Sequence, residues 1–478
     1  MTTPPLSPSP SASTPHSAPS PRRLPLPALI APAAASTVLA LAPVRRPFVA
    51  ATVGWALSMP AIEMPVHVGA SVGAVVASRW ARREGCCGCR RGSRRGSRRG
   101  ASDVAGTILA ALTCAGLGVL VARQFAAAPV LERALAEVRG EVPDTTTTTP
   151  PRSPSGGEAG PAARPGLAAR PGRVAPSGRR AAMGPGQWAA VMLAPWPGVP
   201  RGVRARRGLA YGPDPVANRF DLYVRTDAAR SGTGTGLGSG SGTESDSNSG
   251  PVRGVLVHIH GGHFRAGGPS RESRAMLFDH AARGWAAIST SYHLSPTPEA
   301  GFPQHLVDIK QLLRWIYVEG PAHGIPAGTP IVVAGSSAGA HIAMMTALTA
   351  GNPAYQPGFE EVDTRIAGVV GLYGYYGRLG AATKDISDPG RLPATSAPPA
   401  AIIHGTLDTY TPVRGSRRLV DRLRAGSPNP VMYAELPGAQ HGFDAVRTPR
   451  YLAVSRAVAE FTEWVISRPS SPPASTRH

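Results

Sequence analysis

The sequence is poor in lysine, aromatic residues and cysteine. It has 478 residues, 50 of them basic, yet Lys310 and Lys384 are the only lysines, so arginine carries nearly all of the net charge of +21. Aromatic residues make up 6 % of the chain, and charged residues make up 17 %, against about 25 % in a typical soluble domain. There are four cysteines and none follows Cys114, which excludes a disulfide framework from the C-terminal two thirds.

The sequence also lacks the patterns of a metal site or a nucleotide site. Cys86, Cys87 and Cys89 form a cluster without the second half of a zinc site. No pair of histidines has metal-ligand spacing with supporting carboxylates, and no glycine run follows the strand-to-helix pattern of a phosphate-binding loop. We therefore expect no metal and no cofactor.

The strong positive charge does not indicate a nucleic-acid partner. The densest basic run, residues 79–99, contains nine arginines and is flanked by apolar segments. A basic run in that position is typical of the flank of a membrane span. We expect the membrane to be a partner and nucleic acid not to be one.

Apolar sequence is concentrated in residues 22–140. Stretches at 24–44, 47–78 and 104–122 predict about three transmembrane helices, and the third is uncharged and roughly matches a ~30 Å hydrocarbon core. Buried helices of a soluble protein, or a signal peptide that begins at Arg22, are the alternatives. The arginine-rich run predicts a cytoplasmic loop, so we expect a multi-pass membrane protein whose C-terminal part is extracytoplasmic.

Glycine (56) and proline (51) are abundant and gather in segments that cannot build a core. We expect a disordered N-terminus at 1–21, a Pro/Gly/Thr/Arg-rich linker at 141–182 and a disordered tail at 469–478. Residues 183–468 are then left as one domain, with a Gly/Ser-rich surface insertion at 231–250.

Strand-like and helix-like runs alternate within this domain, which predicts an α/β fold with a doubly wound, mostly parallel sheet. The chain would enter the sheet after an irregular start at 188–207. The expected strands are 220–225, 255–260, 286–292, 331–334, 366–372, 401–404 and 431–436. The expected helices are 302–319, 338–350, 414–423 and 451–465.

The strand at 331–334 leads into Gly335-Ser336-Ser337-Ala338-Gly339, which opens a helix. A nucleophile on a sharp strand-to-helix turn needs small residues two positions away on either side, because backbone segments pass close there. The pattern alone is weak, since the stretch around Ser71 in an apolar segment matches it too. The strand before Ser337 and the helix after it distinguish the two serines.

Three further elements follow strands in the order that a serine hydrolase needs. His260-Gly261-Gly262 ends one strand, and its N–H groups, with that of Ala338, could form an oxyanion hole. Asp408 ends His404-Gly405-Thr406-Leu407-Asp408 after another strand, and His441 follows the last. His441 could serve Ser337 as general base while Asp408 holds its tautomer.

Residues 209–465 resemble the hormone-sensitive-lipase-like branch of the α/β-hydrolases and the related feruloyl-esterase-like and membrane-anchored actinobacterial lipases and esterases. The motifs that carry the resemblance are His260-Gly261-Gly262, Gly335-Ser336-Ser337-Ala338-Gly339, the segment ending in Asp408, and Gln440-His441-Gly442. The resemblance implies Ser337, Asp408 and His441 as catalytic triad, and Gly261, Gly262 and Ala338 as oxyanion donors, with a small-molecule or lipid ester as substrate.

The chain departs from the family pattern at three places. His263 stands where a third glycine is common in the family, and His293 replaces a usual arginine. The segment 379–400 is short, whereas many members of the family carry a helical lid there. A peptidase, amidase or acyltransferase with the same triad remains an alternative, because fold does not fix function. A non-enzymatic membrane sensor is a further alternative.

Overall fold

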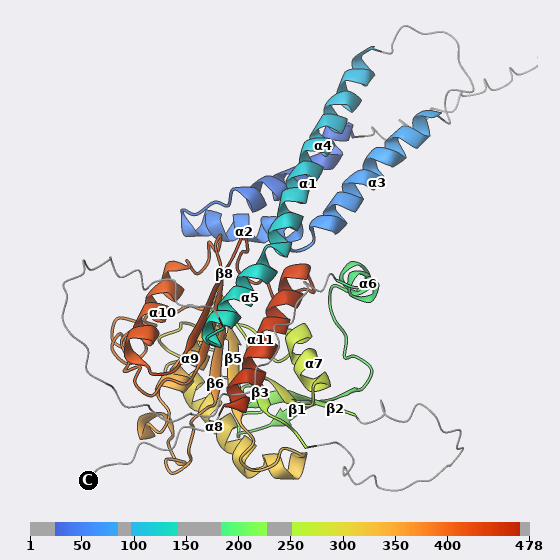
Figure 1. Ribbon diagram of the computed structural model, residues 1–478. Coiled ribbons are helices and arrows are strands. Elements are labelled where there is room, and N and C mark those ends of the chain that lie inside the picture. The colour runs from blue at the N-terminus through green and yellow to red at the C-terminus, as the bar shows by residue number, and fades with distance from the viewer. Residues whose placement is uncertain (1–23, 85–96, 142–182, 227–250, 469–478) are drawn as a thin grey trace, which may run out of the picture.

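The computed structural model describes residues 24–84, 97–141, 183–226 and 251–468 (Figure 1). Five expectations concern residues outside these ranges. They are the disordered terminus at 1–21, the cysteine cluster, nearly all of the linker at 141–182, the insertion at 231–250 and the tail at 469–478.

Eight strands of the described chain form one sheet in the order β1-β2-β4-β3-β5-β6-β7-β8. β2 is antiparallel to β1 and to β4, and all other neighbours are parallel, so the expected mostly parallel sheet is confirmed. The strands are β1 (Val203–Ala210), β2 (Arg219–Arg225), β3 (Val255–Ile259), β4 (Ala286–Thr290), β5 (Ile331–Ser336), β6 (Gly368–Leu372), β7 (Ala400–Gly405) and β8 (Val431–Leu436).

The four central strands β4, β3, β5 and β6 are buried along their whole length. Helices cover both of their faces, which explains why these strands are nearly continuous apolar runs. The edge strand β1 differs, because its sequence VRARRGLA is rich in arginine and only Val203 is buried. The sequence predicted an irregular start there, and the structure corrects that prediction.

Two layers of helices enclose the sheet. One face carries α8 (Gln304–Val318), α9 (Ala338–Leu348) and α10 (Arg414–Gly426), which share a core with Val333 of β5. The other carries α5 (Ala127–Val138), α7 (Arg274–Ala282) and α11 (Pro449–Ser467), which share a core with Val332 and Ala334. Because side chains alternate along a strand, these neighbours in β5 point into opposite layers.

Helix α5 lies where the sequence did not place it. The sequence predicts these residues as part of the membrane region 22–140. In the structure Leu131 and Leu135 are buried in the same core as Trp285 and Phe461, and α5 packs against α11 and β8. The α/β unit therefore includes a helix that precedes the expected domain boundary at residue 183.

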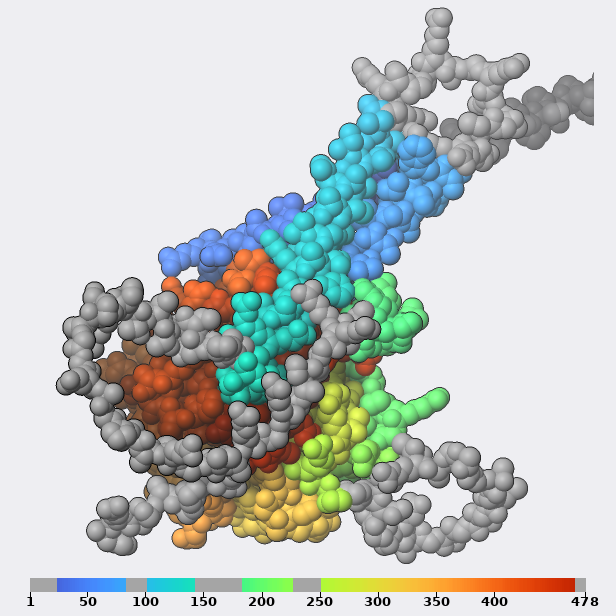
Figure 2. Space-filling model, viewed as in Figure 1, coloured from blue at the N-terminus to red at the C-terminus, as the bar shows by residue number. Residues whose placement is uncertain are grey.

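Four apolar helices precede α5: α1 (Leu26–Leu41), α2 (Phe48–Glu63), α3 (Pro65–Glu84) and α4 (Ser97–Phe125). α1 packs against α4 and α2, and α3 packs against α4. Figures 1 and 2 show α3 and α4 projecting away from the α/β unit, whereas α2 lies across its top.

Fewer helices reach membrane-spanning length than the three expected. Within the described chain one continuous helical stretch, Ala101–Val138, which joins α4 and α5, is long and apolar enough to cross a membrane. The helices Phe48–Glu63 and Pro65–Arg82 qualify only when they are taken together, and a bend of 82° lies between them. Helix α1 is apolar but shorter. By itself, one such helix is weak evidence for a membrane protein.

Candidate active site

The turn between β5 and α9 holds Ser337 in an unusual backbone conformation, with φ 56° and ψ −114°. Positive φ strains any residue that has a Cβ, and such strain gathers at functional sites. Gly335 and Gly339 make the turn possible. A Cβ on Gly335 would lie 2.2 Å from the carbonyl oxygen of Gly339, and one on Gly339 would lie 2.0 Å from that of Ile259. The spacing of small residues around Ser337 thus has a steric cause.

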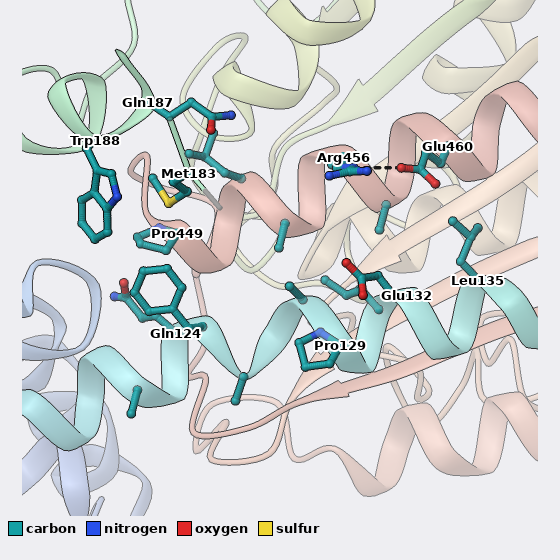
Figure 3. A pocket seen from close by; sticks show the side chains of 18 residues that line it. Gln124, Pro129, Glu132, Leu135, Met183, Gln187, Trp188, Pro449, Arg456 and Glu460 are labelled. Atoms are coloured by element: carbon teal, nitrogen blue, oxygen red, sulfur yellow. Dashed lines mark hydrogen bonds and ion pairs between the residues drawn. The ribbon is translucent and has the colours of Figure 1, made fainter. Parts of the chain in front are cut away.

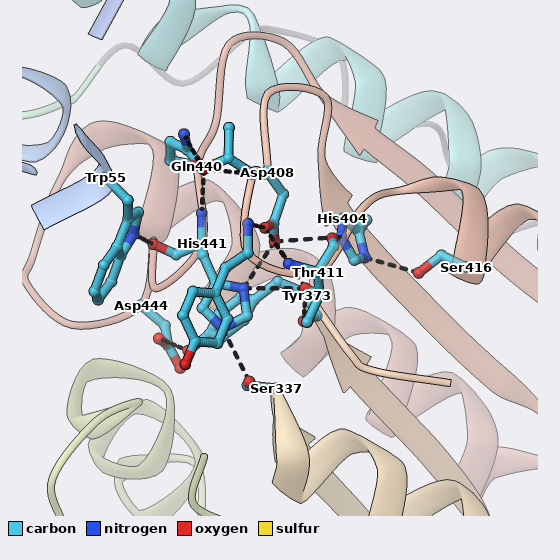
Figure 4. A network of polar contacts seen from close by, with 12 residues as sticks. Trp55, Ser337, Tyr373, His404, Asp408, Thr411, Ser416, Gln440, His441 and Asp444 are labelled. Carbon is cyan, nitrogen blue, oxygen red and sulfur yellow. Dashed lines mark hydrogen bonds and ion pairs between the residues drawn. The ribbon is translucent and has the colours of Figure 1, made fainter. Parts of the chain in front are cut away.

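Ser337, His441 and Asp408 form one hydrogen-bonded chain at the carboxyl edge of the sheet (Figure 4). His441 Nε2 lies 2.9 Å from Ser337 Oγ, and His441 Nδ1 lies 2.8 Å from Asp408 Oδ2. The three residues follow β5, β8 and β7 and are between 7 % and 8 % exposed. The structure thus brings together all three residues that the sequence singled out for the triad.

The carboxylate of Asp408 is held by several donors. Its Oδ1 accepts hydrogen bonds from the N–H groups of Tyr410 (2.9 Å) and Thr411 (2.8 Å), and its Oδ2 accepts from the Thr411 hydroxyl at 3.0 Å. Burial alone would raise the pKa of Asp408, but His441 and His404 outweigh it and hold that pKa below its ordinary value. Asp408 is therefore ionised, and His441 Nδ1 is the donor in their hydrogen bond.

His404 supports Asp408 from behind. Its Nε2 lies 2.7 Å from the carbonyl oxygen of Thr411 and 3.3 Å from Asp408 Oδ2, while its Nδ1 lies 2.7 Å from Ser416 Oγ. From the sequence, His404 was predicted only as the end of a strand. Its place four residues before Asp408 was the available signal.

The oxyanion prediction needs a correction at Gly261. The N–H of Gly261 donates a hydrogen bond to the Glu272 carboxylate, so it is not free for a substrate. Gly261 is needed for a different reason, since a Cβ there would lie 3.0 Å from Ser337 Cβ. In the described chain the N–H groups of Gly262, His263 and Ala338 have no partner, and Gly262 (φ 117°) and His263 (φ 59°) form the tight turn.

His260, the motif residue before these glycines, is a buried support and not part of the triad. Its ring stacks on Tyr292 with centroids 4.5 Å apart, and its Nδ1 lies 2.6 Å from the Gly261 carbonyl oxygen. Burial lowers the pKa of His260 to about 4, so the ring is neutral at ordinary pH.

A buried polar cluster, not predicted from the sequence, lies behind Ser337. The Asp444 carboxylate accepts hydrogen bonds from the Ser336 hydroxyl at 2.7 Å, from the Tyr373 hydroxyl and from Ser273. Burial raises the pKa of Asp444. The Tyr373 ring in turn packs edge-on against His441, with centroids 4.6 Å apart. Asp444 lies only three residues after His441, and that proximity was a usable signal.

Two departures from the family pattern have plain structural outcomes. His293, which stands where relatives have arginine, places its Nδ1 2.7 Å from Asp308 Oδ2 and its Nε2 3.4 Å from Asp214. The segment at 379–400 forms turns without a helix. No lid helix therefore comes from that segment.

One apolar cavity lies away from the triad. It has a volume of about 660 Å³ and lies between α4–α5, α11 and the short helix α6 (Pro185–Leu193) (Figure 3). Its lining is mostly apolar, with Trp188 at one end and the Arg456–Glu460 ion pair (2.9 Å) at the other. In the described residues no group of three or more His, Cys, Asp or Glu side chains is placed to hold a metal.

Comparison with known proteins gives consistent results. A family profile described as BD-FAE matches residues 245–383. The chain is 31 % identical over 284 residues to the probable carboxylic ester hydrolase LipM of Mycobacterium tuberculosis, a match that covers 53 % of this chain and 59 % of that protein. It is 30 % identical over 303 residues to the esterase LipQ of the same organism, covering 56 % and 66 %.

Among solved structures, Thermogutta terrifontis esterase 2 phosphorylated by paraoxon is 20 % identical, with a TM-score of 0.44. That match covers 58 % of this chain and 98 % of the other. The chain spans about three fifths to two thirds of the length of the two mycobacterial relatives. These sequence similarities, the strand order of the sheet and the strained serine turn together support an α/β-hydrolase of the esterase and lipase type.

Proposed function

We propose that this protein is a serine carboxylesterase or lipase that hydrolyses carboxylic esters through an acyl-enzyme on Ser337. The observation that carries the proposal is the continuous hydrogen-bonded chain from Ser337 through His441 to Asp408. The names of the mycobacterial relatives, carboxylic ester hydrolase and esterase, point to the same reaction.

The residues of the site have distinct roles in this reaction. Ser337 Oγ attacks the carbonyl carbon of the ester while His441 Nε2 takes the hydroxyl proton. The carbonyl oxygen becomes an oxyanion, which the N–H groups of Gly262 and Ala338 stabilise, and the His263 N–H lies in the same turn. The C–O bond then breaks, and His441 returns the proton to the leaving alcohol.

The second half of the reaction repeats these roles with water. His441 removes a proton from a water molecule, which attacks the acyl-enzyme, and collapse of the second oxyanion releases the acid and restores Ser337. Asp408, as a carboxylate, stabilises the imidazolium that forms in both halves and keeps the Nδ1 proton in place.

A substrate panel separates esters from amides. With the full chain in detergent micelles, we expect the best of a series of 4-nitrophenyl esters to give a higher kcat/KM than the best aminoacyl 4-nitroanilide. The reason is that an ester carbonyl is more electrophilic than an amide carbonyl, and 4-nitrophenolate is a better leaving group than the 4-nitroanilide nitrogen. Faster cleavage of the anilides would instead identify an amidase or peptidase.

We also propose that the chain is tethered to a membrane by its N-terminal helices, with the α/β unit on the side opposite the basic run at 79–99. Helix α4 begins at Ser97, at the end of that run, and continues into α5 on the sheet. Several apolar side chains of α4 are exposed, among them Val104 (60 %), Ile108 (56 %) and Leu112 (66 %). Exposed apolar ridges of this kind suit contact with lipid.

The membrane proposal predicts two outcomes for the full chain expressed in a bacterium. The protein should stay in the membrane pellet after an alkaline carbonate wash and enter solution only with detergent, because its apolar helices would lie in lipid. An epitope tag at the C-terminus should be removed by protease added to intact spheroplasts. Release by carbonate would contradict the tether, and a protected tag would contradict the orientation.

A further inference from the structure

Helix α2 lies across the carboxyl end of the sheet (Figure 1), and its Trp55 contacts the catalytic histidine. Its C-terminal end is tied to the α/β unit by an ion pair between Glu63 and Arg450, 3.0 Å long, whose side chains are 3 % and 1 % exposed. Its middle and N-terminal parts carry Trp55 and Phe48, whose rings lie 5.8 Å and 5.5 Å from the ring of Tyr410. The helix is thus held at both ends against the loops of the active site.

Trp55 makes the contact that matters for chemistry. Its indole Nε1–H donates a hydrogen bond of 2.9 Å to the main-chain carbonyl oxygen of His441, and the two rings meet edge to face with centroids 6.3 Å apart (Figure 4). In the described chain this indole is the sole partner of the His441 carbonyl. A residue 386 positions away in the sequence therefore holds the backbone of the general base.

The backbone N–H of His441 is held by the residue that precedes it. The Gln440 side chain accepts hydrogen bonds from the N–H groups of Thr409 (2.9 Å) and His441 (3.2 Å). On the other side follows Gly442 with φ 81°, a residue that rotates easily. Without the indole, the carbonyl oxygen of His441 has no partner among the described residues, and the next backbone hydrogen bond is the one that the Gly442 carbonyl accepts from the Ala445 N–H at 3.1 Å. This peptide group is bonded to the Cα that carries the imidazole, so its rotation changes the direction of the ring toward Ser337.

We propose that Trp55 is a positioning residue for His441, so that α2 is a working part of the active site and not only an anchor. The proposal rests on the proposed function, in which His441 Nε2 takes the Ser337 proton. A shift of about 1 Å between reacting groups can lower a rate by about 10²-fold, so loss of one positioning hydrogen bond has a measurable effect on kcat.

The test replaces Trp55 by Phe, which keeps an aromatic ring but removes the donor, in the full chain in detergent micelles. Trp80→Phe is the matched control, because Trp80 lies on α3 with 51 % exposure and, among the described residues, has no ring contact and no side-chain hydrogen bond. Titration with a fluorophosphonate counts the competent sites, and 4-nitrophenyl butyrate hydrolysis then gives kcat per competent site and KM.

We expect Trp55→Phe to lower kcat per competent site about tenfold with KM unchanged, because only alignment of the base is lost. Trp80→Phe should match wild type. If kcat per competent site is unchanged in Trp55→Phe, the proposal is overturned, even if fewer sites titrate, since that pattern belongs to a merely structural residue.

Two further variants keep the test decisive. If Trp55→Phe does not fold, benzothienylalanine at position 55 keeps the shape of the indole and removes only the N–H, and the same kcat criterion applies. If Ser337→Ala hydrolyses the ester as wild type does, the proposed function itself fails. That result is distinct from an unchanged kcat in Trp55→Phe alongside an inactive Ser337→Ala.

Discussion

Ser337→Ala is expected to lower kcat for ester hydrolysis by about 10⁶-fold, because removal of the nucleophile from such a triad costs nearly as much as removal of the whole triad. The loss should be in kcat, since the oxyanion donors of Gly262 and Ala338 and the binding surface stay in place. Stability should change little, because within the described parts of the chain the Ser337 side chain has one hydrogen bond, to His441 Nε2.

The matched control for this variant is Ser71→Ala. Ser71 sits in a second Gly-x-Ser-x-Gly pattern, but in α3, where its hydroxyl donates a hydrogen bond to the His67 carbonyl oxygen one helical turn earlier. Both variants should be compared in the 4-nitrophenyl ester assay and in labelling by a fluorophosphonate. Ser71→Ala should react as wild type does, whereas a folded Ser337→Ala that still labels would show that the nucleophile is another residue.

The strands of the α/β unit could be predicted from the sequence where both faces of a strand are buried, or where buried and exposed side chains alternate along it. Strand β5, IVVAGS, and the strand β3, VLVHI, are apolar because helices cover both faces of the central sheet. The turn at Ser337 was predictable because Gly335 and Gly339 avoid real steric clashes. Asp408 and His441 follow strands at the same edge of the sheet, where parallel strands assemble sites.

Other parts were missed because tertiary contacts override local patterns. Edge strand β1 is stabilised by pairing with β2, and its arginines gave no strand signal. Gly261 was predicted as an oxyanion donor because the motif shows where its N–H lies along the chain. The sequence does not show that the Glu272 side chain, 11 positions later, folds back onto that N–H.

The role of the N-terminal helices was the least predictable feature. Their apolar composition shows that these helices avoid water. It does not show whether they face lipid or protein, because an apolar helix has the same kind of sequence in both places. The contact between Trp55 and His441 joins residues 386 positions apart, and no local pattern encodes such a pair. The same holds for α5, whose amphipathic face suits a membrane surface as well as the core in which Leu131 lies.

The second large effect is expected for Asp408→Asn, which should lower kcat about 10⁴-fold while the fold is retained. The backbone N–H groups of Tyr410 and Thr411 both donate to Asp408 Oδ1. In the variant these two donors would hold the amide oxygen on their side. The amide nitrogen would then face His441 Nδ1, where the carboxylate Oδ2 lies at 2.8 Å in the wild type.

An amide nitrogen in that place donates a hydrogen bond to Nδ1 and cannot accept one. The His441 proton must then move to Nε2, which lies 2.9 Å from Ser337 Oγ, and a protonated Nε2 cannot take the hydroxyl proton. The measurement is kcat for 4-nitrophenyl butyrate together with the thermal unfolding temperature. Asp421→Asn, on the exposed side of α10, is the control and should match wild type in both kcat and unfolding temperature.

If Asp408→Asn folds and keeps a kcat close to that of Asp421→Asn, then Asp408 does not set the tautomer of His441. The base would in that case be held by its other neighbours, Thr411 and Trp55.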